Sequence, residues 1–246
     1  MSTRDVQNMK KLKIGVFAYN WPHLKTQSGI LNLCTSNFKP SVVIGADPVE
    51  LKFYKSKIRV TPRDLYINDT RDLCDLLKID YKVMIHNSDE CANFIRNLDL
   101  DVGIVLGARI LKKEIIDSFN MGIINMHPGL LPENRGLDNL KWAIIKNIKQ
   151  GVTSHLINSK IDMGKMILRE EIKVYSDDSL VDIHLRLQSK EQEMMIKSLK
   201  ILENIDNVEL LENLDSGKNY HRSVPPELEK DLDKALVKYL DVFGEK

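Results

Sequence analysis

The sequence lacks the short motifs of three common enzyme classes. No G-x-G-x-x-G follows the first predicted strand, and neither G-x-x-x-x-G-K-[ST] nor G-x-S-x-G occurs in the chain. These patterns build the dinucleotide-binding turn, the phosphate-binding loop and the nucleophile elbow of serine hydrolases. Their absence disfavours nicotinamide chemistry, P-loop phosphoryl transfer and serine hydrolysis.

Cysteine and long hydrophobic runs are also scarce. Cys34, Cys74 and Cys91 are odd in number and form no C-x-x-C pair, which argues against a disulfide framework and a structural zinc site. The apolar stretch within residues 1–20 is too short and too interrupted for a signal peptide or a membrane-spanning helix. We therefore expect reduced thiols, a cytoplasmic protein and no membrane partner.

An excess of charge of either sign is missing as well. The 36 Lys and Arg residues nearly cancel the 35 Asp and Glu residues, which leaves a net charge of +1. This balance gives no reason to expect a nucleic-acid partner, and a charged ligand must be held by local groups. The 246 residues, 43% of them hydrophobic, suffice for one sizeable core.

Short apolar runs alternate with helical patterns over the first half of the chain. The predicted strands there are residues 12–18, 41–46, 81–86, 101–107 and 121–127. The predicted helices between them are residues 24–36, 70–78, 89–98 and 112–119. Strands separated by helices of this length favour a mostly parallel sheet covered on both faces, which is the three-layer α/β class.

The second half of the chain carries a different pattern. The predicted elements are a helix at 137–147, a strand pair at 151–158 and 165–174, and a long helix at 179–205. After residue 205 we expect a C-terminal β-hairpin turning at Asp215-Ser216-Gly217, followed by a helix over 227–242. We divide the chain into a main domain, residues 1–205, and an appended hairpin and helix, residues 206–246.

Polar side chains gather at the end of the strand at 121–127. Alternation along a strand places Asn125 and His127 on one face, and Pro128 ends the strand. His155 and Asp162 are further candidates, although a lone histidine is often structural and an aspartate near a glycine often forms a turn. A metal site of His127, His155 and Asp162 is one alternative, but no closely spaced ligand pair supports it.

Two longer strings make the reading more specific. "NMHPGLLPENRG" at 125–136 and "GVTSHLINSKIDMG" at 151–164 resemble the family of formyltransferases that use 10-formyltetrahydrofolate. This resemblance implies a Rossmann-like fold, a folate cosubstrate and no metal. The implied catalytic residues are Asn125, His127 and Asp162. The segments "GARIL" at 107–111 and "NSKID" at 158–162 match those that cradle the pterin, which implies cofactor contacts from Arg109, Ile110, Leu111, Ile161 and Asp162.

The residue types suit this chemistry. Acyl transfer from a formamide needs a donor for the developing oxyanion, a base for the amine proton and a route for a proton to the leaving nitrogen. Asn125 can donate an amide N–H to the oxyanion, and His127 can act as base or donor. Asp162 can orient water or His127 and ease proton transfer.

The acceptor is inferred from a narrower resemblance. "HPGLLPENRGLDNLKWAI" at 127–144 and "NYHRSVPPEL" at 219–228 are similar to small bacterial sugar N-formyltransferases. This implies a homodimer that formylates a nucleotide-linked amino sugar, dTDP-4-amino-4,6-dideoxyglucose, for the O-antigen of lipopolysaccharide. The expected substrate contacts are Arg135, Lys141, Lys218, Tyr220, His221 and Arg222. The plain alternative for the tail residues is an ordinary hairpin with polar decoration.

Other functions remain open from the sequence. Members that formylate glycinamide ribonucleotide usually carry Ser where this chain has Gly129. Members that formylate methionyl-tRNA carry a larger basic C-terminal domain than the stretch after residue 205. A formyl-folate hydrolase would share the same pocket and release formate, and a nucleotide-sugar binder without activity would not need the Asn, His and Asp.

Overall fold

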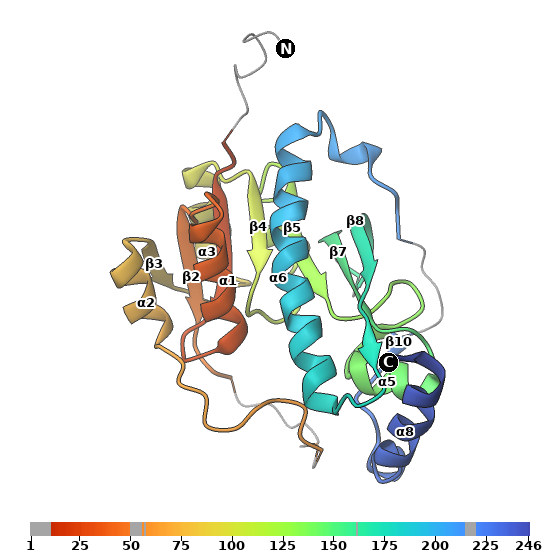
Figure 1. Ribbon diagram of the computed structural model, residues 1–246. Coiled ribbons are helices and arrows are strands. Elements are labelled where there is room, and N and C mark those ends of the chain that lie inside the picture. The colour runs from red at the N-terminus through yellow and green to blue at the C-terminus, as the bar shows by residue number, and fades with distance from the viewer. Residues whose placement is uncertain (1–10, 50–55, 57, 161, 215–219) are drawn as a thin grey trace, which may run out of the picture.

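A seven-stranded sheet forms the centre of the molecule (Figure 1). The computed structural model describes residues 11–49, 56, 58–160, 162–214 and 220–246. The strand order is β3-β2-β1-β4-β5-β7-β8. Strands β1 to β5 are parallel, while β7 runs antiparallel to both β5 and β8. The predicted mostly parallel α/β sheet is confirmed.

The strands follow the apolar runs of the sequence. Those of the main sheet are β1 (Ile14–Tyr19), β2 (Val42–Ala46), β3 (Asp80–Val83), β4 (Val102–Val105), β5 (Gly122–His127), β7 (Gly151–Ile157) and β8 (Gly164–Glu171). The central strands are buried on both faces, which is why they read as continuous Val- and Ile-rich runs rather than as alternating ones.

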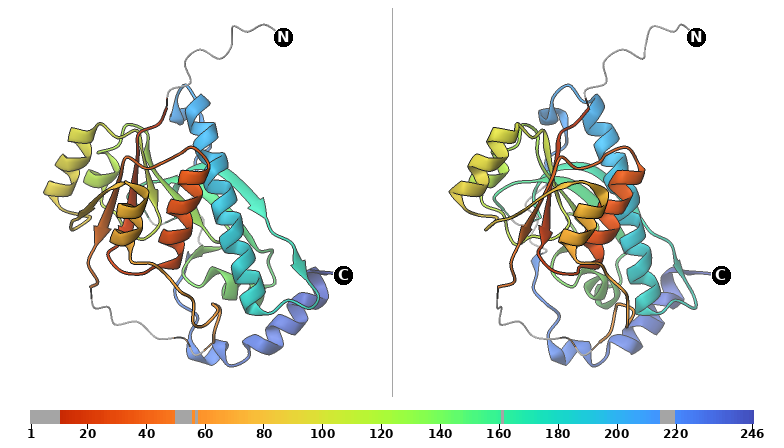
Figure 2. Two further views of the ribbon diagram at one scale, coloured as in Figure 1. Left: turned by 60° about the vertical axis from the view of Figure 1, so that its left-hand side comes forward. Right: turned by 90° about the vertical axis from the view of Figure 1, so that its left-hand side faces the viewer.

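Helices cover both faces of the sheet, which completes the three layers (Figure 2). The main helices are α1 (Leu24–Thr35), α2 (Thr70–Leu77), α3 (Asp89–Leu98), α4 (Lys113–Ile116), α5 (Asn139–Lys146) and α6 (Leu180–Asn204). Buried side chains of α1, α2 and α6 share one core with β1 and β5, and those of α3 and α4 form a second core on the other face. Ser179 begins α6 with a capping box, in which Ser179 and Asp182 each bond the other's backbone N–H.

The predicted C-terminal hairpin is wrong. The segments before and after the predicted turn at 215–217 pair with different partners and not with each other. Asn213 bridges to Lys165 of the outer strand β8, whereas β10 (Tyr220–His221) pairs parallel with β6 (Arg135–Gly136). The edge of β8 and the short β6 both offer unpaired backbone groups, so each segment completes an existing element instead of pairing with the other. The turn at 215–217 lies outside the described residues.

The rest of the tail is helical and joins the main body. Two helices, α7 (Pro226–Glu229) and α8 (Leu232–Phe243), replace the single predicted helix over 227–242. Leu232 and Tyr239 are buried in the same core as α1 and α6. Three short elements complete the structure: η1 (Val208–Leu210), β9 (Val174–Tyr175) and β11 (Gly244–Glu245), of which the last two pair.

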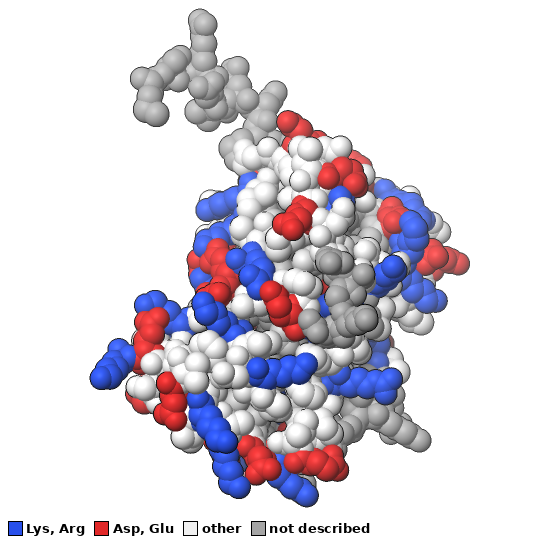
Figure 3. Space-filling model, turned by 90° about the vertical axis from the view of Figure 1, so that its right-hand side faces the viewer, with Lys and Arg blue, Asp and Glu red and all other residues white. Residues whose placement is uncertain are grey.

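Surface charge and hydropathy agree with the near-neutral composition. Basic and acidic side chains are interspersed over the face beside β8 (Figure 3). Within the described ranges, no helix combines the length and the apolar character that crossing a membrane requires.

The strand order of the sheet reverses between β1 and β4. From β1 the chain continues outward to β2 and β3, and from β4 it continues in the other direction to β5. Ligand crevices of open α/β sheets lie at the carboxyl ends of strands beside such a switch point.

Candidate active site

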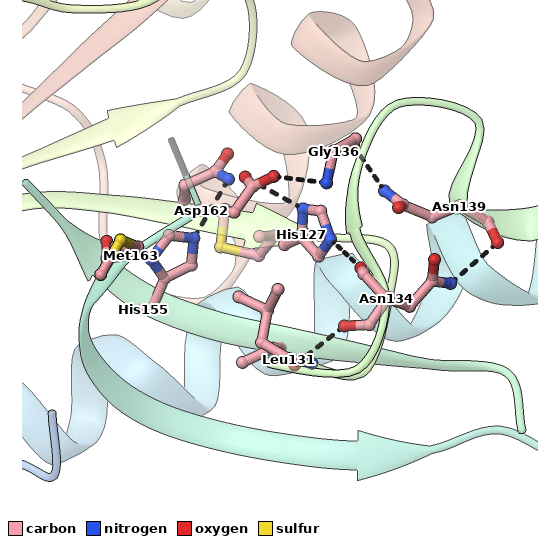
Figure 4. A network of polar contacts seen from close by, with 12 residues as sticks. His127, Leu131, Asn134, Gly136, Asn139, His155, Asp162 and Met163 are labelled. Carbon is pink, nitrogen blue, oxygen red and sulfur yellow. Dashed lines mark hydrogen bonds and ion pairs between the residues drawn. The ribbon is translucent and has the colours of Figure 1, made fainter. Parts of the chain in front are cut away.

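His127 is the last residue of β5 and lies between two oxygen atoms (Figure 4). Its Nε2 is 2.8 Å from the carbonyl oxygen of Asn134, and its Nδ1 is 3.2 Å from Oδ1 of Asp162. Both neighbours are acceptors, and only a protonated imidazole donates from both ring nitrogens. Each ring nitrogen of His127 therefore faces an acceptor for any hydrogen that it carries.

The loop after β5 is fixed by the motif residues of β7. The hydroxyl of Thr153 donates to the Gly129 carbonyl at 2.8 Å and accepts from the Leu131 N–H at 3.0 Å. The Asn134 side chain donates to the Asn139 carbonyl at 2.9 Å, at the start of α5. These bonds place the Asn134 carbonyl against His127, and they explain why the Gly-Val-Thr string accompanies the Asn-x-His-Pro string.

Asp162 is the partner that connects His127 to a second loop. Its Oδ2 accepts the Gly136 N–H at 2.8 Å. Burial would raise the pKa of the Asp162 carboxyl, but the hydrogen bond and positive charge of His127, together with the Gly136 N–H, outweigh burial and lower that pKa. Asp162 is thus a carboxylate at neutral pH.

Replacing Asp162 by asparagine tests this electrostatic arrangement through stability. A carboxyl whose pKa is lowered on folding stabilises the protein above its unfolded pKa, and the contribution disappears as pH falls through the folded value. We expect Asp162→Asn to lower the free energy of unfolding at neutral pH, with a gap to wild type that closes below about pH 4. Urea unfolding across this range measures it. The exposed Asp177→Asn is the control; an equal gap at every pH would contradict the assignment.

Asn125 is held by a neutral histidine on the adjacent strand. β5 and β7 place Asn125 opposite His155, and the Asn125 side-chain nitrogen lies 3.4 Å from the His155 Nε2. Complete burial, followed by the charge of His127, lowers the pKa of His155 to about 4. The His155 Nδ1 lies 3.2 Å from the Met163 carbonyl, so Nδ1 carries the proton and Nε2 accepts from Asn125.

The same contacts speak against the metal alternative. Both nitrogens of His155 and both nitrogens of His127 already face a protein partner. In the described part of the chain, no three His, Cys, Asp or Glu side chains gather as a ligand group. The metal site of His127, His155 and Asp162 is therefore not formed in this arrangement.

A first cavity of about 210 Å³ opens beside Asn125. Its lining comprises the segment after β4 and the segment after β7: Val105, Ala108, Arg109, Ile110, Leu111, Asn125, Ile157, Asn158, Lys160 and Asp162. The structure thus brings together Arg109, Ile110, Leu111 and Asp162, four of the residues expected at the pterin site. The fifth, Ile161, lies outside the described residues. Lys160 also lines this cavity and was not singled out from the sequence.

A second and larger cavity, of about 760 Å³, has His127 in its lining. Its walls are the turn after β1, the segment 60–67, the start of α5 and one face of α6. Sequence reasoning missed several of its polar residues, among them His23, Lys25, His184 and Glu191. Lys25 and Glu191 form a salt bridge at 2.7 Å, and the His184 Nε2 is buried with no hydrogen-bond partner among the described residues.

Part of this set could have been found from the sequence. His23 and Lys25 follow the first strand directly, and the carboxyl ends of parallel strands meet at one edge. His184 and Glu191 are seven residues apart, hence on one face of α6, but helical spacing alone does not show that this face meets a cavity.

Three of the predicted substrate contacts in the tail do not line the larger cavity. Tyr220, His221 and Arg222 do not line it; Tyr220 is exposed, and the ring of His221 packs 4.9 Å from that of Trp142. Lys218 is outside the described residues. Arg135 is buried in β6 beside Tyr220. The nucleotide role of these five residues stays a prediction.

Lys141 does lie in the cavity wall, but its charge is already compensated. Its Nζ is 2.7 Å from both the Glu229 carboxylate and the Ser56 hydroxyl, and the Lys141 and Glu229 side chains are 5% and 4% exposed. The Lys141 ammonium group therefore stabilises the cavity wall, and its charge is balanced without a ligand.

Comparison with known proteins places this architecture in a family. The family model described as "Formyl transferase" matches residues 54–199, which is more than half of the chain. The chain belongs to the formyl transferase family.

Individual relatives differ in the acceptor that their names state. A methionyl-tRNA formyltransferase from Clostridium tetani is 29% identical over 167 residues, covering 67% of this chain and 48% of the relative. One from Flavobacterium johnsoniae is 37% identical over 111 residues, covering 45% of this chain and 35% of the relative. The matches thus span less than half of these curated relatives.

Solved structures share the fold at lower identity. A glycinamide ribonucleotide transformylase from Symbiobacterium toebii superposes with a TM-score of 0.62 at 20% identity, covering 85% of this chain and 96% of that one. A sugar N-formyltransferase from Shewanella sp. FDAARGOS_354 gives 0.61 at 18% identity, covering 92% and 89%. A 4-N formyltransferase from Francisella tularensis gives 0.59 at 19% identity, covering 92% and 88%.

Proposed function

We propose that this protein transfers a formyl group from 10-formyltetrahydrofolate to the amine of a nucleotide-linked amino sugar, with dTDP-4-amino-4,6-dideoxyglucose as the leading candidate. One observation carries the proposal. Asn125 and Asp162 line the smaller cavity, His127 lines the larger one, and His127 contacts Asp162. A donor and an acceptor bound in the two cavities would meet at these three side chains.

The smaller cavity fits a folate ring system. Val105, Ile157 and Leu111 are apolar residues of its lining, and Asn125, Asn158 and Lys160 are polar ones. Pockets for small ligands combine apolar walls with a few placed polar groups in this way. Within this proposal, Arg109, Ile110, Leu111 and Asp162 hold the donor.

The three central side chains then have separate tasks. The Asn125 amide, oriented by His155, donates an N–H to the oxygen of the formyl group as negative charge develops there. The attacking amine loses a proton to the His127–Asp162 pair, where the carboxylate stabilises the imidazolium. The same pair returns a proton to the leaving nitrogen, so the protein ends in its starting protonation state.

The lining of the larger cavity suits the sugar part of the acceptor rather than its pyrophosphate. Lys25 and Lys141, the two lysines in its wall, are neutralised by Glu191 and Glu229. The free Nε2 of His184 offers a hydrogen bond to a sugar hydroxyl. A side chain at Gly129 would also place its Cβ 2.6 Å from the Asn134 carbonyl, so this loop does not accept the serine that is usual in the ribonucleotide enzymes.

An acceptor panel tests the proposal. The protein is incubated with 10-formyltetrahydrofolate and, separately, dTDP- and UDP-linked 3-amino and 4-amino sugars, glycinamide ribonucleotide and methionyl-tRNA. Mass spectrometry should find a formyl gain on a 4-amino sugar nucleotide. The tRNA is included because curated relatives are named for it, and formylation of tRNA or of the ribonucleotide alone would replace the proposed acceptor.

Replacing His155 by phenylalanine tests its role as the residue that orients Asn125. The ring volume remains, but Asn125 loses its acceptor and the Met163 carbonyl loses its donor. One hydrogen bond contributes about 1 kcal/mol, so we expect kcat to fall roughly fivefold with the donor KM little changed. Steady-state kinetics measures this; His155→Gln, which keeps an amide acceptor, should recover part of the loss. An unchanged kcat in His155→Phe would contradict the role.

A further inference from the structure

The C-terminal segment 220–229 contacts the loop that carries Gly136. Backbone pairing joins Tyr220 to Arg135 and His221 to Gly136, and the Leu137 N–H donates to the His221 carbonyl at 2.9 Å. These are main-chain contacts between segments far apart in the sequence. They fix the loop at the point where it approaches Asp162.

Gly136 is shaped by this contact. Its φ of +101° lies where L side chains are rare, and a Cβ there would come within 2.0 Å of the His221 carbonyl. The N–H of the same residue donates to Asp162 at 2.8 Å. The tail thus holds one side of Gly136 while Asp162 accepts from the other.

Two further hydrogen bonds attach the tail to this loop and to α5. The Val224 N–H donates to the Asp138 carboxylate at 2.9 Å, and the Trp142 indole N–H donates to the Arg222 carbonyl at 2.7 Å. Asp138 and Trp142, the side chains in these two bonds, belong to the same stretch of chain as Gly136 and Lys141.

Glu229 makes the most buried attachment. Its carboxylate binds the Lys141 ammonium and the Ser56 hydroxyl, and Lys141 binds Ser56 in turn. Ser56 precedes the segment 60–67, which forms part of the wall of the larger cavity, and Lys141 lies in another part of that wall. Glu229 thus holds Lys141 in the wall and anchors the chain just before 60–67.

We propose that the segment 220–229 is a positioning element of the active site, which holds the 135–142 stretch so that the Gly136 N–H meets Asp162 and Lys141 stays in the cavity wall. The inference adds to the proposed function a positioning part played by the backbone of 220–224 and by the Glu229 side chain, none of which lines either cavity. Its structural half does not depend on which acceptor is used.

Glu229→Gln is the direct test. The change keeps the shape of the side chain but leaves the Lys141 ammonium buried opposite a neutral amide, which is strongly destabilising for a local contact. In hydrogen–deuterium exchange of the protein alone, we expect amides within 135–142 to exchange at least about tenfold faster, while those of β1 and β4 keep their rates. Glu227→Gln, exposed on the same helix, should change nothing.

A second variant keeps the test decisive if Glu229→Gln folds poorly. Trp142→Phe removes only the indole N–H bond to Arg222, and it should raise exchange in the same stretch by a smaller factor. Unchanged exchange over 135–142 in both variants, or an equal rise throughout the chain, would overturn the proposal.

In steady-state kinetics, both variants should lower kcat and leave the KM for the formyl donor unchanged. Faster exchange in a protein without formyl transfer would refute the proposed function and leave the positioning role standing.

Discussion

Replacing His127 by asparagine is expected to lower the rate of formyl transfer roughly 10²- to 10⁴-fold, the usual contribution of a positioned acid or base. Asparagine keeps a polar side chain of similar reach but has no nitrogen that can take up a proton. The Asp162 carboxylate would then stabilise no imidazolium, although the Gly136 N–H would still bind it.

Rapid-quench turnover with both substrates bound measures this effect on the chemical step. Asp162 acts through His127 in our account, so the double variant His127→Asn, Asp162→Ala should lose much less than the product of the two single losses. Turnover near the wild-type rate in His127→Asn would remove this residue from the mechanism. If the double variant lost the full product of the two single losses, Asp162 would act independently of His127.

Asn125→Ala is the second large effect, with an expected loss of roughly 10²- to 10³-fold in kcat, as for other oxyanion donors. In our proposal the Asn125 amide is the uncharged hydrogen-bond donor to the oxyanion; it lines the smaller cavity with Asp162, and alanine leaves His155 Nε2 without its partner. The KM for the acceptor should change little, because Asn125 does not line the larger cavity.

Steady-state kinetics of Asn125→Ala should be compared with Asn93→Ala, which changes an exposed asparagine of α3 that lines neither cavity. The control should keep wild-type kcat. If Asn125→Ala kept kcat and raised only the donor KM, Asn125 would be a binding residue and the oxyanion would need another donor.

The sequence predicted the parts of the fold that follow local rules. Central parallel strands are continuous apolar runs, and α3 begins at Ser88, whose side chain accepts the Cys91 N–H as a helix cap. The end of β5 was predictable for the same reason, because alternation and Pro128 place Asn125 and His127 at the strand end. The contact of Asp162 with His127 came only from the family resemblance.

What the sequence could not predict depends on tertiary contacts. The strand propensity of the tail was read correctly at Tyr220 and His221, but propensity does not select a partner, and β6 was available. Likewise, helical spacing predicted the long helix over 179–205 without showing that His184 and Glu191 border a cavity. The sequence predicted Lys141 as a substrate contact, and only the structure shows the Glu229 carboxylate beside it.

A mass balance of one reaction tests the central claim most directly. The protein is mixed with 10-formyltetrahydrofolate and dTDP-4-amino-4,6-dideoxyglucose, and tetrahydrofolate, formylated sugar nucleotide and free formate are measured together. We predict one formylated sugar nucleotide for each tetrahydrofolate formed, with no formate above that of a His127→Asn control. Formate released in step with tetrahydrofolate, while the amine stays unmodified, would contradict the account and identify the protein as a hydrolase of the formyl donor.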